Sequence, residues 1–69
     1  MRKELIEAVK LHALGNIEKH KMNIEVYLAN PVGIGEHPDI MAAIEQELAK
    51  AAEFDEKLKL LEEICREHG

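Results

Sequence analysis

Histidine has the widest chemistry of the side chains in this 69-residue sequence, because it binds metal ions and transfers protons near neutral pH. His12, Asn16 and His20 recur at steps of four residues, which places them in one line along a helix. If the chain folds back at Ile34, residues equally distant from that point lie level with one another. The sequence then predicts two neighbouring pairs, His20 with Glu47 and His12 with Asp55.

Three interpretations of these His and carboxylate residues are open. They can form a metal site inside a helical bundle, doubled by the symmetry of an oligomer. They can instead form hydrogen-bonded pairs that fix the register of two helices, or they can be separately solvated. Carboxylate-bridged metal bundles use a Glu-x-x-His pair on one helix, and neither predicted helix has one. The register pair is therefore favoured, and neither a metal nor another cofactor is predicted. If the chain did bind a metal ion, the candidate ligands would be His12, His20, Glu47 and Asp55.

A wider polar stripe follows the same helix at alternating steps of four and three residues. Its members are Asn16, His20, Asn23, Tyr27 and Asn30. Such a stripe is typical of a hydrogen-bonded network at an interface or of the wall of a binding groove. The network is the favoured interpretation.

The sequence offers little for covalent catalysis. Ser and Thr are absent, and the single Cys65 has no basic cluster or helix N-terminus beside it to activate its thiol. We therefore expect no catalytic residue and no enzymatic activity, and we expect Cys65 to be a small core residue.

Two long helices must position these side chains. Apolar residues at helical spacing predict helices over about 2–29 and about 38–67, joined by a loop at 30–37 that contains Pro31, Gly33 and Gly35. Pro38 suits the first helical position, with Asp39 in the first turn. Gly15-Asn16 could divide the first helix, but the apolar period continues through it, so an unbroken helix is favoured. The expected seam comprises Ile6, Val9, Ala13, Ile17, Ile24, Tyr27 and Leu28 on the first helix and Ile40, Ile44, Leu48, Ala51, Phe54, Leu58, Leu61 and Cys65 on the second.

A second apolar strip lies on another side of the first helix. It contains Leu11, Met22 and Val26, flanked by Ala8 and Ala29. A helix that is apolar on two sides needs two partner helices, and a hairpin supplies only one. The sequence therefore predicts an all-α antiparallel hairpin that self-associates, most simply as a dimer, into a four-helix bundle or larger, with Leu11, Met22 and Val26 at the interface.

The loop is the least generic stretch of the sequence. Its Gly-x-Gly lacks the third glycine, the strand and the lysine of a phosphate loop, and Glu36 would repel an anion. The loop is either a structural lid over the end of the bundle or a presented recognition surface. The candidate interaction residues are Asn30, Val32, Ile34, Glu36 and His37.

The composition argues against several other classes of function. The net charge is −5, and most of the acidic residues lie in the second half of the chain, which argues against binding nucleic acid. The sequence has no apolar run that could span a membrane, and its charged beginning does not look like a secretion signal. A single cysteine suits a reducing compartment, so one small cytoplasmic domain, residues 1–69, is expected.

Residues 23–40, Asn-Ile-Glu-Val-Tyr-Leu-Ala-Asn-Pro-Val-Gly-Ile-Gly-Glu-His-Pro-Asp-Ile, resemble a segment of small uncharacterised helical proteins of marine tailed phages, including those of cyanobacteria. That family has no assigned activity or catalytic residues, so no residue role is carried over. The resemblance implies a phage-encoded accessory protein that works in the cytoplasm of a bacterial host.

Two functions follow as hypotheses. The first is a small non-enzymatic module that binds itself and another, unidentified protein. The alternative is a metal- or ligand-binding helical bundle that uses the His and carboxylate side chains.

Overall fold

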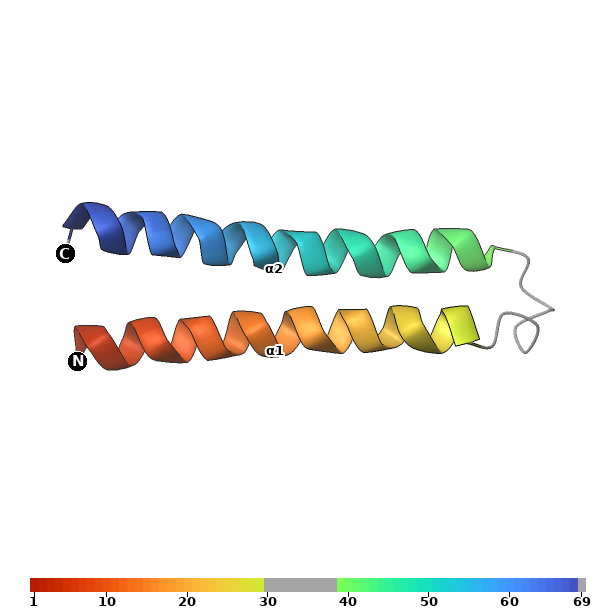
Figure 1. The fold of residues 1–69 in the computed structure, drawn as a ribbon, viewed down its shortest axis with the longest axis horizontal. Coiled ribbons are helices and arrows are strands. Elements are labelled where there is room, and N and C mark those ends of the chain that lie inside the picture. Colours follow the sequence, from red (N-terminus) through yellow and green to blue (C-terminus); the bar gives the residue numbers. More distant parts are fainter. Residues whose placement is uncertain (30–38, 69) are drawn as a thin grey trace.

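Two long helices lie side by side and run in opposite directions (Figure 1). The computed structural model describes residues 1–29 and 39–68, with α1 at Arg2–Ala29 and α2 at Ile40–His68. Both chain ends lie at the same end of the hairpin, and the described residues extend over 51 × 17 × 13 Å. The predicted all-α antiparallel hairpin is therefore confirmed.

Helix α1 passes through Gly15 without a break, as favoured above. Its first turn is closed by a hydrogen bond from the Leu5 amide to the Met1 carbonyl, and Glu4 lies close to the N-terminal ammonium at 3.0 Å. A Cβ atom at Gly15 would meet nothing within 4 Å, so neither the hairpin's packing nor a steric contact requires a glycine there.

Replacing Gly15 by alanine should stabilise the protein. Glycine inside a helix costs about 1 kcal/mol relative to alanine, and the hairpin leaves room for the added methyl group. We expect the melting temperature of Gly15→Ala to rise by about 4–8 °C, measured by circular dichroism. A fall would mean that another helix packs against the Gly15 backbone.

Helix α2 begins two residues later than expected. It starts at Ile40, and the Asp39 carboxylate accepts a hydrogen bond from the Ala42 amide at 3.2 Å. The Ala43 amide donates to the Asp39 carbonyl, which makes Asp39 the N-cap. The prediction that Asp39 stands inside the first turn was wrong, because its short carboxylate caps the turn from outside.

The contact between the helices follows a seven-residue repeat on both of them. The least exposed positions are spaced alternately by three and four residues, which is the pattern of an antiparallel coiled coil. We call these positions the seam; they are Ile6, Lys10, Ala13, Ile17, His20, Ile24 and Tyr27 on α1 and Ile40, Ile44, Glu47, Ala51, Phe54, Leu58, Leu61 and Cys65 on α2.

The seam is narrower than the sequence suggested. Val9, Leu28 and Leu48, all expected to be in it, are more than half exposed. Each adjoins a seam position but points to one side of it. Lys10 takes the seam position beside Val9, and His20 takes a seam position as its predicted pairing with Glu47 requires. Cys65 is half-buried in the seam, as expected for a small core residue.

Candidate functional site

The best-defined polar cluster lies midway along the seam, where the two helices each contribute a polar residue. His20 Nδ1 lies 2.7 Å from Glu47 Oε1, and the His20 side chain is buried. Since a carboxylate oxygen only accepts, Nδ1 carries the hydrogen of this bond. The predicted meeting of His20 and Glu47 is confirmed.

Asn23 completes this cluster from the next turn of α1. Its Nδ2 donates to the same Glu47 oxygen at 2.9 Å. Within the described residues, no buried side-chain nitrogen or oxygen is left without a hydrogen-bond partner. A satisfied polar group inside a seam fixes one alignment of the helices, because any other alignment would leave it unpaired.

These two hydrogen bonds also change the acidity of the carboxyl group. Donation from Asn23, followed by donation from His20, lowers the pKa of Glu47 below its usual value, and desolvation opposes this with a smaller effect than either hydrogen bond. Positive charge on His20 and on Lys50 acts in the same direction. The cluster therefore holds Glu47 in its ionised form.

Phe54 supports the imidazole of His20. The two rings are stacked at 6.3 Å between centroids with 19° between their planes. His12 meets another part of Phe54 edge-on at 5.9 Å, and Lys57 lies 5.0 Å over the ring. This single aromatic side chain of α2 thus fixes the position of the His20 ring that donates to Glu47.

The second predicted pair does not form. His12 is instead 3.3 Å from the Asn16 amide nitrogen, which also donates to the His12 carbonyl at 2.9 Å. Asp55 pairs with Lys59 on its own helix at 3.0 Å. His12 and Asp55 lie at similar heights along the hairpin but on opposite sides of the seam, so Phe54 takes the place opposite His12.

The four metal candidates accordingly do not converge. Among residues 1–29 and 39–68, no group of three or more His, Cys, Asp or Glu side chains could hold a metal ion. The residues of the polar stripe also make separate contacts. Asn23 donates a hydrogen bond to Glu47 on α2, whereas Asn16 donates to the His12 carbonyl on its own helix. The cluster is built for hydrogen bonding between helices.

The predicted interaction residues divide into two sets. Leu11, Met22 and Val26 are more than half exposed on α1, as an unpartnered strip must be in a single hairpin. The loop candidates Asn30, Val32, Ile34, Glu36 and His37 lie outside the described residues, and so does Pro38.

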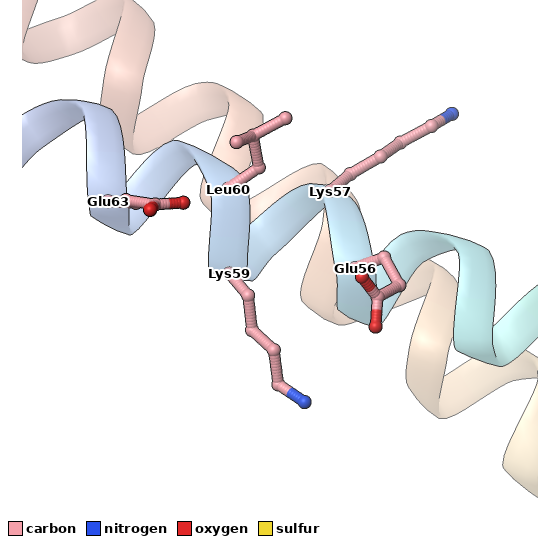
Figure 2. A pocket seen from close by; sticks show the side chains of 5 residues that line it. All are labelled: Glu56, Lys57, Lys59, Leu60 and Glu63. Atoms are coloured by element: carbon pink, nitrogen blue, oxygen red, sulfur yellow. The ribbon is translucent and has the colours of Figure 1, made fainter.

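Two surface hollows accompany the helices. One, of about 290 Å³, is bounded by α2 side chains alone, and Figure 2 shows Lys57 and Lys59 pointing away from each other around it. The other, of about 340 Å³, is more apolar and lies between the helices, lined by Ile17, Lys21, Ile24, Leu48, Ala51, Ala52 and Asp55. This second groove was not predicted from the sequence; the signal that points to it is Leu48, an apolar residue directly after the seam residue Glu47.

Comparison with protein-family models, with curated proteins and with solved structures finds no match to this chain. Neither described helix is long and apolar enough to cross a membrane.

Proposed function

We propose that this protein is a small non-enzymatic interaction module, a helical hairpin that self-associates and presents its remaining surface to another protein. The observation that carries the proposal is how little the hairpin buries. Over residues 1–29 and 39–68, the buried side chains are Ala13 and His20, and neither is a large apolar residue.

Such a hairpin lacks the interior that a free-standing domain needs. Chains below about 70–80 residues rarely gain enough stability from one core, and they use disulfides, metals or association instead. The lone Cys65 allows no internal disulfide, and the described His and acidic side chains form no metal cluster. Association is the remaining means of stabilising helices whose stability depends on packing.

The exposed apolar side chains supply the surface for association. Large apolar residues at least two-fifths exposed occur along both helices, including Leu11, Leu14, Met22, Val26 and Leu28 on α1 and Met41, Leu48, Leu60 and Ile64 on α2. Scattered single residues of this kind are ordinary, but so many on two helices support a partner surface.

The alternative hypothesis of a metal-binding bundle has no observation in its favour, because its candidate ligands are spread over different contacts. The resemblance of residues 23–40 to small marine phage proteins supports, within this proposal, an accessory protein of a bacterial cytoplasm. An unidentified protein partner is part of the same proposal.

Sedimentation equilibrium between about 1 and 100 µM tests the self-association, together with circular dichroism on the same samples. We expect at least twice the 7.8 kDa chain mass, and a melting temperature that falls on dilution, because dissociation and unfolding are coupled. A fully helical 7.8 kDa species at every concentration would contradict the proposal.

A further inference from the structure

We draw no further inference here: the strongest candidate, the apolar groove between α1 and α2 that is lined by Ile17, Ile24, Leu48 and Ala51, is an unpartnered face, and nothing in the described part of the chain shows what covers it.

Discussion

Removing either member of the His20–Glu47 pair should destabilise the protein, and removing both should cost less than the sum of the two single effects. His20 is buried and 2.7 Å from Glu47, so truncating one partner leaves the other without its hydrogen bond inside the seam. We expect His20→Ala and Glu47→Ala each to lower the melting temperature by roughly 5–10 °C. Thermal and urea unfolding of the four proteins of this cycle measure the coupling.

His12→Ala is the matched control for the cycle. His12 is exposed and touches α2 only through the edge of Phe54, so its removal should have a small effect that adds to that of Glu47→Ala. Additive effects for His20 and Glu47 as well would show that the pair does not stabilise the hairpin as a unit.

The double variant His20→Leu/Glu47→Leu examines why a polar pair occupies the seam at all. Replacing both buried polar partners with apolar residues is often neutral or stabilising. We expect this variant to be at least as stable as wild type but less uniform in assembly, as polar seam residues specify register in coiled coils. A single unchanged oligomer would contradict the register role.

Acid should remove the contribution of the pair. The Asn23 and His20 hydrogen bonds lower the pKa of Glu47, so ionised Glu47 stabilises the fold fully above the pKa of an unfolded glutamate, about 4.3. As the pH falls through the still lower folded pKa, Glu47 becomes protonated and this stabilisation is lost. We expect the difference in melting temperature between wild type and Glu47→Gln to shrink as the pH falls from about 5 toward 3.

Comparison with Glu47→Gln is needed because the N-terminal ammonium also lowers the pKa of Glu4, which adds its own loss of stability in acid. Both proteins contain Glu4, so its effect cancels in the difference. A difference that stayed constant down to pH 3 would mean that the Glu47 carboxylate gains nothing from Asn23 and His20.

The sequence predicted the hairpin well because its strongest signals are local. Apolar spacing through Gly15 gave one unbroken helix, and the proline that follows Asn30 placed its end at Ala29, where the structure has it. Equal distance from the loop brought His20 level with Glu47, since antiparallel helices rise by the same amount per residue.

The sequence could not show on which side of the seam each side chain next to it would lie. His12 and Asp55 are also equally distant from the loop and were therefore predicted to pair, but their side chains point to opposite sides of the seam. Leu48 and Val9 were assigned to the seam because aliphatic residues at helical spacing cover a wider stripe than one partner helix can bury. The sequence did place His20 and Glu47 at seam positions, but only the paired backbones show that Leu48 lies beside the seam, next to the groove.

The unbroken seven-residue repeat of the seam makes the length of this hairpin modular. Removing seven consecutive residues from the same level within both helices would shorten the molecule by two turns and keep every remaining seam residue in the seam, opposite its present partner. An insertion of a single residue would instead rotate all that follows it by about 100° and turn the seam toward solvent. We therefore expect this architecture to tolerate insertions and deletions of whole seven-residue repeats, made at the same level in both helices.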